Sequence, residues 1–166
     1  MKLRLLILML PIIFFSSFKK EEKKITYKTQ IQSEIDRDSI IAFAKKYLGT
    51  PYVYASNNPE KGFDCSGFVN YVFKNYGVTL PRSSGEYKNI GKKLNPEEFK
   101  VGDILVFYGY KNNTVIGHLG IICEANGMQS KFIHASSGKA QCVTITALDT
   151  EHYTKRFYKC IDVLSE

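Results

Sequence analysis

The sequence has few of the residues that build metal and redox sites. Its 166 residues include no tryptophan, three histidines and four cysteines, and no two of the cysteines form a CxxC pair. Zinc ribbons and thioredoxin-type redox sites use such pairs, so we expect neither kind of site. We also expect that the chain uses no metal ion and no organic cofactor.

Positive charge is present but not clustered. The formal net charge is +7, yet Lys2, Arg4, Lys19 and Lys20 lie in the first twenty residues, which contain no acid. Without these four residues the formal charge falls from +7 to +3. A nucleic-acid-binding domain needs clustered Lys and Arg on a recognisable module, and the sequence has neither. We therefore expect no nucleic-acid partner.

No apolar run in the sequence is long enough to cross a membrane comfortably. The run Leu5–Phe15 follows the basic residues Lys2 and Arg4 and precedes two serines, a pattern typical of an export signal, which we place at residues 1–18. We therefore expect an exported protein of the periplasm, the cell envelope or the extracellular space. The alternative is an uncleaved segment that anchors the chain, which is the only membrane contact we expect.

The remainder of the chain fits one domain. Residues 19–35 are polar and lack strong periodicity, so we predict a linker there and a single domain over residues 36–166. Hydrophobic residues make up 44% of the chain and charged residues 23%, a balance that excludes a disordered chain. We expect this domain to act as a monomer.

Helical periodicity dominates the first half of the domain. Apolar residues recur at helical spacing in the segment 36–49, and Gly49 suits its C-terminal stop. A second helix is predicted from about Cys65 to Tyr76, closed by Gly77. The segment 80–103 is rich in turn residues and holds at most a short helix.

Short strands dominate the second half. Five runs rich in β-branched and aromatic residues are separated by Gly, Asn and Ser: residues 103–109, 118–125, 131–136, 142–146 and 156–164. Helices first and strands second favour an α+β fold with an antiparallel sheet, rather than alternating βαβ units. We expect the helices to cover one face of that sheet.

Cys65 is the first candidate for a chemical role. It lies in the first turn of the second predicted helix, directly after Asp64, which is a good N-cap. The N–H groups at a helix N-terminus lower the pKa of a thiol, so the position favours a reactive thiolate. Gly62 and Gly67 allow a close approach of backbone or substrate. Most cysteines at a helix start are nevertheless structural, because reactivity needs a base nearby.

The other three cysteines are interpreted as small buried side chains, with one disulfide among them as the alternative. They are Cys123, Cys142 and Cys160.

His118 and His134 are the candidate bases. His118 begins one predicted strand and His134 lies late in the next. Neighbouring antiparallel strands would bring the two together on the face that meets the cysteine helix, where one imidazole takes the thiol proton and the other orients it. From composition and spacing alone, a Cys–His–His site and two histidines buried in the core are equally good interpretations. His152 lies in a charged stretch and is interpreted as a surface residue.

Six motifs together resemble a known family. In order along the chain they are FDCSGFV, LPRSS, VGDILVF, GHLGI, FIHASS and YTKRF. This order is similar to that of the NlpC-type cell-wall peptidases, which are bacterial papain-like cysteine endopeptidases. The likeness runs from Ile40 to the end of the chain and implies the papain-like fold of that family, with helices packed on an antiparallel sheet.

The resemblance also implies roles. Cys65 matches the nucleophile of the family, His118 the general base, and His134 the third polar residue, which orients the base. Tyr52 matches a tyrosine that helps to stabilise the oxyanion, with a packed loop aromatic as the alternative. Tyr54 is interpreted as packing.

The chain departs from the family pattern beside the site. Ala55 and Ser56 stand where a pair of glycines is usual, and Tyr87 stands where glutamine is frequent. Arg82 and Ser83 either hold the loop beside the site or form a structural turn. These departures bear on specificity more than on the chemistry.

The function implied by the resemblance is hydrolysis of the stem peptides of peptidoglycan, which are the expected partner. The usual bond lies between D-γ-glutamate and the next diamino acid, meso-diaminopimelate or lysine, and is cut through a thiolate and a thioester intermediate. One alternative is an amidase or acyltransferase that uses the same Cys–His–His set. Another is a catalytically silent wall-binding module.

Overall fold

The structure is a computed structural model that describes residues 36–165. The expected export signal at residues 1–18 and the expected linker at residues 19–35 lie outside the described residues. None of the helices between Asp36 and Ser165 is long and apolar enough to cross a bilayer.

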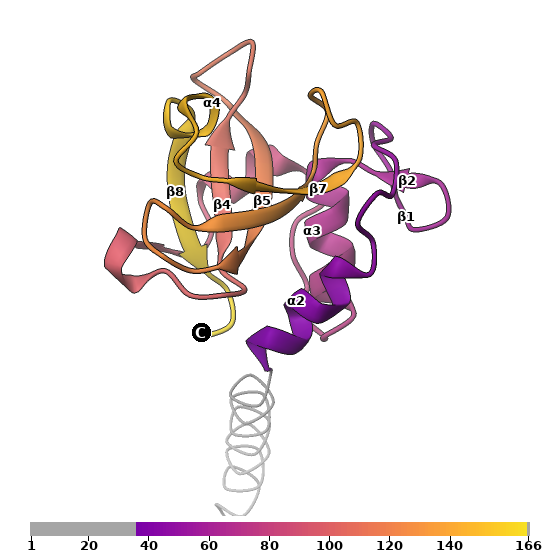
Figure 1. The fold of residues 1–166 in the computed structure, drawn as a ribbon, viewed down its shortest axis with the longest axis horizontal. Helices are drawn as coiled ribbons and strands as arrows, with labels where there is room; N and C mark the ends of the chain where they lie inside the picture. Colours follow the sequence, from indigo (N-terminus) through magenta and orange to yellow (C-terminus); the bar gives the residue numbers. More distant parts are fainter. Residues whose placement is uncertain (1–35, 166) are drawn as a thin grey trace, which may run out of the picture. The chain divides into compact units, whose positions relative to one another are not determined.

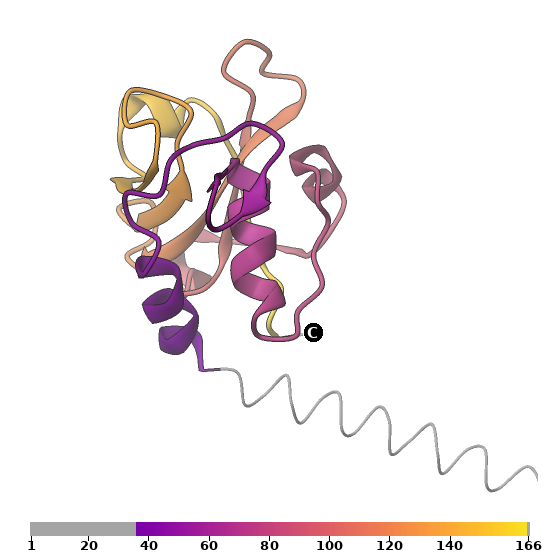
Figure 2. The same cartoon turned by 90° about the vertical axis from the view of Figure 1, so that its right-hand side faces the viewer.

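Two helices form one layer of the fold (Figures 1 and 2). Helix α2 spans Arg37–Lys45 and is capped by Asp36, whose side chain accepts from the N–H of Asp38. Helix α3 spans Cys65–Lys74 and buries an apolar face. Both helices stop earlier than their sequence patterns suggest, because turns carry the chain on to Gly49 and Gly77, each of which has a positive φ.

The second layer is a six-stranded antiparallel sheet in the order β3-β8-β4-β5-β6-β7. Its strands are β3 Lys92–Leu94, β4 Ile104–Tyr108, β5 Ile116–Glu124, β6 Lys131–Ala135, β7 Val143–Ala147 and β8 Phe157–Asp162. The sheet is strongly twisted, so that β7 runs across the direction of β4 and β8 (Figure 1). The predicted α+β class is confirmed.

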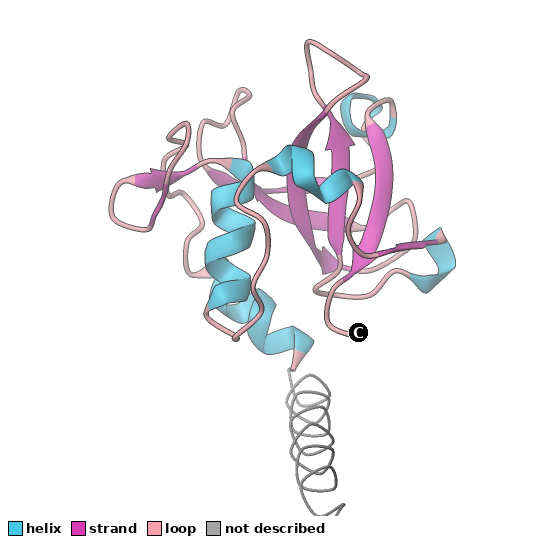
Figure 3. Ribbon diagram, turned by 180° about the vertical axis from the view of Figure 1, so that it is seen from behind, coloured by secondary structure: helices cyan, strands magenta, loops and turns pink. Residues whose placement is uncertain are grey.

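Shorter elements complete the chain. A small hairpin pairs β1 Asn57–Asn58 with β2 Gly62–Phe63. The turn-rich segment holds two 3-10 helices, η1 Ser84–Lys88 and η2 Pro96–Glu98, and α4 Glu151–Thr154 precedes β8. Seen from behind, η1 lies against the strands, where it packs on β5 (Figure 3).

The two faces of the sheet bury different clusters. Alternate residues of β5 and β6, such as Leu119 and Ile133, pack with α2 and α3. The residues between them face a second cluster that includes Phe107, Phe132 and Tyr153. Helices α2 and α3 therefore cover one face, as expected, whereas the short helix α4 places Tyr153 in the cluster on the other face.

Strand β5 begins at Ile116, two residues earlier than expected. The strand continues through Gly117 because a Cβ there would lie 2.6 Å from Gly109 Cα, so only glycine permits this pairing with the end of β4. His118 is therefore held inside a strand rather than at its first residue.

Ala55 is one of the places where the backbone is strained. Its φ is +58°, a left-handed conformation that costs a residue with a Cβ about 1–2 kcal/mol. This is one of the two positions where the sequence replaces the usual glycine pair. Ala55 therefore adopts a conformation that glycine adopts without strain.

We expect Ala55→Gly to raise the free energy of unfolding by about 0.5–1 kcal/mol, because relief of the strain exceeds the extra entropy of the unfolded chain. Urea unfolding measures the change. Ala140→Gly is the matched control, because Ala140 is exposed and its φ is not positive. Equal losses of stability in the two variants would contradict the strain at Ala55.

Candidate active site

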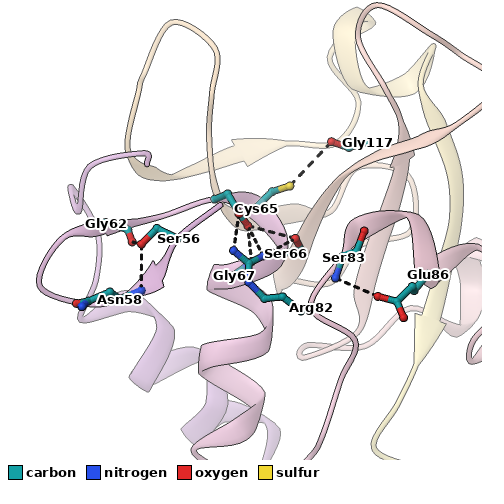
Figure 4. A network of polar contacts seen from close by, with 11 residues as sticks. Ser56, Asn58, Gly62, Cys65, Ser66, Gly67, Arg82, Ser83, Glu86 and Gly117 are labelled. Carbon is teal, nitrogen blue, oxygen red and sulfur yellow. Dashed lines mark hydrogen bonds and ion pairs between the residues drawn. The ribbon is translucent and has the colours of Figure 1, made fainter. Parts of the chain in front are cut away.

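The start of α3 is held by one carboxylate. Asp64 Oδ1 accepts from the backbone N–H of Gly67 at 2.6 Å, which caps the helix. Arg82 donates to both oxygens of the same carboxylate, Nη1 to Oδ1 at 3.0 Å and Nη2 to Oδ2 at 2.6 Å (Figure 4). A bidentate guanidinium fixes a carboxylate in direction as well as distance. Arg82 thus holds the helix start beside Cys65, and does more than form a turn.

Two glycines let the preceding loop lie against this helix start. A Cβ on Gly67 would lie 2.1 Å from Ser56 O, and that carbonyl accepts from Asp64 N at 2.9 Å. A Cβ on Gly62 would lie 2.4 Å from Pro51 O. The expectation that both glycines serve a close approach is confirmed, and the approaching group is the backbone of the loop.

Cys65 points from the first turn of α3 to the beginning of β5. Its thiol donates to Gly117 O, with Sγ 3.9 Å from the oxygen (Figure 4). The backbone N–H of Leu119 also faces the sulfur. Because Gly117 and Leu119 flank His118 in the chain, the thiol is placed against the strand residue that carries the imidazole.

Burial decides the charge of this thiol. It raises the pKa of Cys65 to about 11, with a further contribution from the negative charge of Asp64. The N–H groups of Leu119 and Ser66 lower the pKa, but by less. The expected low pKa is therefore wrong for the free protein. The helix N-terminus acts in the expected direction, and desolvation outweighs it.

The two histidines form a buried, hydrogen-bonded pair. His118 Nε2 lies 2.9 Å from His134 Nδ1, and His134 Nε2 lies 3.0 Å from the hydroxyl of Thr146 on β7. Burial lowers the pKa of His118 far below its ordinary value and that of His134 to about 3. Both rings are therefore neutral at neutral pH. If Nε2 of His118 carries the proton, its Nδ1 is a free acceptor for the thiol.

The histidines lie on the face of the sheet opposite to the one we expected. Their rings contact Phe107, Phe132 and Tyr153, the cluster that faces away from α3. Residues of a strand alternate between faces, and Leu119 occupies the helix side next to His118. Cys65 therefore meets this segment at the start of β5 and not across the helix-covered face.

Gly120, which has no side chain, allows the rings of His118 and His134 to lie close together. Gly120 stands on the same face as His118, and a Cβ there would lie 2.3 Å from the ring of Phe132 and 3.3 Å from His134 Cβ. Without it, the rings of His118 and His134 meet edge to face with centroids 4.9 Å apart. The second glycine of the GHLGI motif, Gly120, thus makes room for the paired histidine rings.

Two tyrosines, Tyr52 and Tyr87, lie near the thiol, whereas Tyr54 does not contribute to the site. The Tyr52 phenol is half-buried, and burial followed by the charge of Cys65 raises its pKa, so it lies near the sulfur. Tyr54 is 84% exposed, so its interpretation as packing is wrong. Tyr87 is fully buried, donates to Pro81 O at 3.1 Å, and also responds to the charge of Cys65. Tyr87 of η1 therefore forms one side of the surroundings of Cys65.

The remaining cysteines are all unpaired in the structure. Cys123 and Cys160 are buried as expected, whereas Cys142 is half-buried. Between Asp36 and Ser165, no group of three His, Cys, Asp or Glu side chains is arranged to hold a metal ion.

A pocket of about 450 Å³ opens beside His118. Its walls include Tyr110, Gly117, Tyr153 and Arg156. His152 also lines it, and this side chain is exposed as expected. Arg156 and Thr146 were not predicted as site residues from the sequence. Arg156 lies in the YTKRF motif, which was the available signal, whereas Thr146 is one of several strand threonines and carries none.

We expect the protein to lose stability as the pH falls from about 6.5 to 5. Each buried neutral histidine has a depressed pKa in the folded state, so the unfolded chain binds more protons, at about 1.4 kcal/mol per pH unit and histidine. Urea unfolding across this range measures the slope, and His134→Gln should halve it. A free energy of unfolding that stays constant from pH 7 to 5 would contradict two buried neutral rings.

We also expect alkylation of Cys65 by iodoacetamide to rise about tenfold per pH unit between pH 7 and 10, because the raised pKa keeps the thiol protonated. Mass spectrometry of the Cys65 peptide gives the rate. The control is the same peptide in urea, where the rate should level off near the ordinary thiol pKa of about 8.5. A plateau below pH 8 in the folded protein would instead place the proton on His118.

Comparisons with known proteins agree with the motifs. The model of the NlpC/P60 family matches residues 49–162. A Bacillus subtilis protein named gamma-DL-glutamyl hydrolase is 37% identical over 118 residues, which cover 70% of this chain and 27% of that protein. A Haemophilus influenzae protein named "Probable endopeptidase" is 31% identical over 146 residues, which cover 87% of this chain and 86% of that protein.

The fold agrees as well. A solved NlpC/P60 family protein from Bacillus cereus superposes with a TM-score of 0.68 at 28% identity, over 78% of this chain and 40% of that one. The chain therefore spans well under half the length of this protein and of the Bacillus subtilis relative. The family match over most of the domain, with the near full-length likeness to the Haemophilus influenzae protein, shows that this chain belongs to the NlpC/P60 family.

Proposed function

We propose that this protein is a cysteine endopeptidase that hydrolyses the stem peptides of peptidoglycan between D-γ-glutamate and the following diamino acid. The observation that carries the proposal is the placement of the Cys65 thiol against the strand segment of His118, with His134 and Thr146 behind that imidazole. The relatives named as a gamma-DL-glutamyl hydrolase and as an endopeptidase support both the γ-glutamyl bond and the reaction type.

The first step transfers one proton as one bond forms. Cys65 Sγ attacks the carbonyl carbon of the scissile amide, and the thiol proton passes to Nδ1 of His118. Because burial keeps the thiol neutral in the free protein, the proton leaves as the sulfur attacks and not beforehand. The neutral ring of His134 accepts from Nε2 of the imidazolium and so stabilises its charge.

The next steps return the proton and release the products. The oxyanion of the tetrahedral intermediate accepts from the backbone N–H of Cys65 and from the Tyr52 hydroxyl. His118 gives its proton to the departing amine nitrogen, the C–N bond breaks, and a thioester to Cys65 remains. Water then attacks the thioester with His118 as base, which releases the acid and restores the thiol.

His134 and Thr146 are positioning residues in this scheme. The reaction requires that Thr146 Oγ1 accepts from His134 Nε2–H, so that Nδ1 of His134 is the acceptor for His118; the distances of 3.0 and 2.9 Å allow this order. With this order of donors, Nδ1 of His118 carries no proton and is able to act as the base for the thiol. The same substrate also agrees with an exported protein that acts on the cell wall, for which the apolar segment 5–15 is the supporting feature.

Digestion of a purified stem tetrapeptide, read by mass spectrometry, tests the proposal. We expect the wild type to cleave after D-γ-glutamate and Cys65→Ala to show no cleavage. Cys123→Ala is the matched control, because this buried cysteine lies at the other end of β5, and it should keep its activity. His118→Ala should lower kcat by at least about a hundredfold, since it removes both general base and general acid.

Other products would favour other functions. A cut between sugar and peptide, or transfer of the acyl group to an added amine, would identify an amidase or an acyltransferase on the same residues. Binding of the folded wild type to peptidoglycan with no product of any kind would identify a wall-binding module.

A further inference from the structure

Arg156 is a half-buried cation without an acidic partner. Its Nε donates to Tyr108 O at 2.9 Å, and its Nη1 donates to Nε2 of His152 at 2.6 Å. No carboxylate between Asp36 and Ser165 lies within ion-pair distance of it, although Arg37 and Arg82 each hold at least one. Its Nη2 group has no hydrogen-bond partner in this part of the chain. A desolvated guanidinium with free donors is a site for an anion.

The surroundings of Arg156 are arranged to leave these donors open. The guanidinium lies over the ring of Tyr153, 5.9 Å from its centroid, and Tyr153 packs in turn on His118. Burial followed by the charge of Arg156 lowers the pKa of His152, so this ring is neutral and accepts from the guanidinium. The Tyr110 ring stacks at a tilt on His152 and completes the outer wall.

The position of the pocket relative to His118 indicates which part of a substrate would enter the pocket. The pocket is lined by His118 and by Gly117 before it, and Ser137, which also lines it, hydrogen-bonds the Tyr52 phenol. Arg82, which is paired with Asp64, does not line it. His118 is the group that protonates the departing amine in the proposed reaction. The amine side of the scissile bond must therefore pass over His118 and into this pocket.

We infer that this pocket binds a carboxylate carried by the residue on the amine side of the scissile bond, with Arg156 as its partner. The inference rests on the proposed function and extends it from the bond to the leaving group. Of the two diamino acids, meso-diaminopimelate carries a carboxylate at the end of its side chain and lysine does not. Arg156 therefore makes the protein selective for meso-diaminopimelate whose side-chain carboxylate is free.

Three stem tetrapeptides test this selectivity: one with meso-diaminopimelate, one with its side-chain carboxamide, and one with lysine. All three end in D-alanine, so that their C-terminal carboxylates are the same. We expect the wild type to cleave the free acid with a kcat/KM about 10- to 100-fold above that of the amide. This ratio corresponds to the free energy of one charge-assisted hydrogen-bonded contact. Arg156→Gln should remove this preference, because it lowers kcat/KM on the free acid more than on the amide and lysine peptides.

Lys155→Gln is the matched control. It removes the same charge from the neighbouring residue, which is exposed and paired with Glu151 and does not line the pocket. It should leave the preference intact, and thermal unfolding of each variant establishes that it is folded. Equal wild-type rates on the free acid and the amide, or an equal loss on all three peptides in Arg156→Gln, would overturn the inference while the endopeptidase proposal stands.

Binding separates the pocket from the chemistry. Cys65→Ala keeps the pocket without the nucleophile, and calorimetry measures its affinity for the same three peptides. Tighter binding of the free acid that is lost on adding Arg156→Gln supports the pocket even if no peptide is cleaved, in which case only the endopeptidase proposal fails. Equal affinity for the free acid and the amide overturns the pocket whatever the cleavage result.

Discussion

The carboxylate of Asp64 is the point on which the site depends. It caps α3 through Gly67 N and is gripped at both oxygens by Arg82, while its own backbone N–H donates to the carbonyl of Ser56. A helix start, a loop and a distant turn therefore meet at one residue. Because Cys65 follows directly, the direction of its thiol toward β5 is set by this carboxylate and not by contacts of the cysteine alone.

Burial governs the chemistry next to that carboxylate. The same packing that brings the thiol against the His118 segment removes water from both groups, so it raises the pKa of Cys65 and lowers that of His118. A helix N-terminus favours the thiolate, but an excluded solvent disfavours any isolated charge more strongly. The arrangement is suited to moving a proton during attack, when the charge that forms is shared between the sulfur, the imidazole and the oxyanion.

The two arginines of the site differ in their ion pairs: Arg82 is paired with a carboxylate, and Arg156 is not paired with one in the described residues. Arg82 is satisfied by Asp64 and contributes order, whereas Arg156 keeps donors free beside His118. Two arginines beside the same site can thus have different roles. The difference lies in whether the chain supplies a carboxylate, and in our proposal the substrate supplies the one that Arg156 lacks.

Local sequence determined the helix start with its cap, the alternating strands, the α+β class and the motifs that identify the family. These features depend on neighbouring residues, so spacing and residue type are sufficient to find them. Cys65, His118 and His134 became candidates in the same way, through a glycine-bearing loop before a helix and two strand histidines.

Only the tertiary structure decided the rest. The face on which the histidines lie depends on the phase of each strand in the sheet, and β5 begins two residues earlier than its apolar pattern suggests. The high pKa of Cys65 depends on solvent excluded by segments far away in the chain. The role of Thr146 depends on the pairing of β6 with β7, and that of Arg156 on the absence of a nearby carboxylate. Register, burial and absent partners are properties of the assembled fold, because they are set by residues distant in sequence.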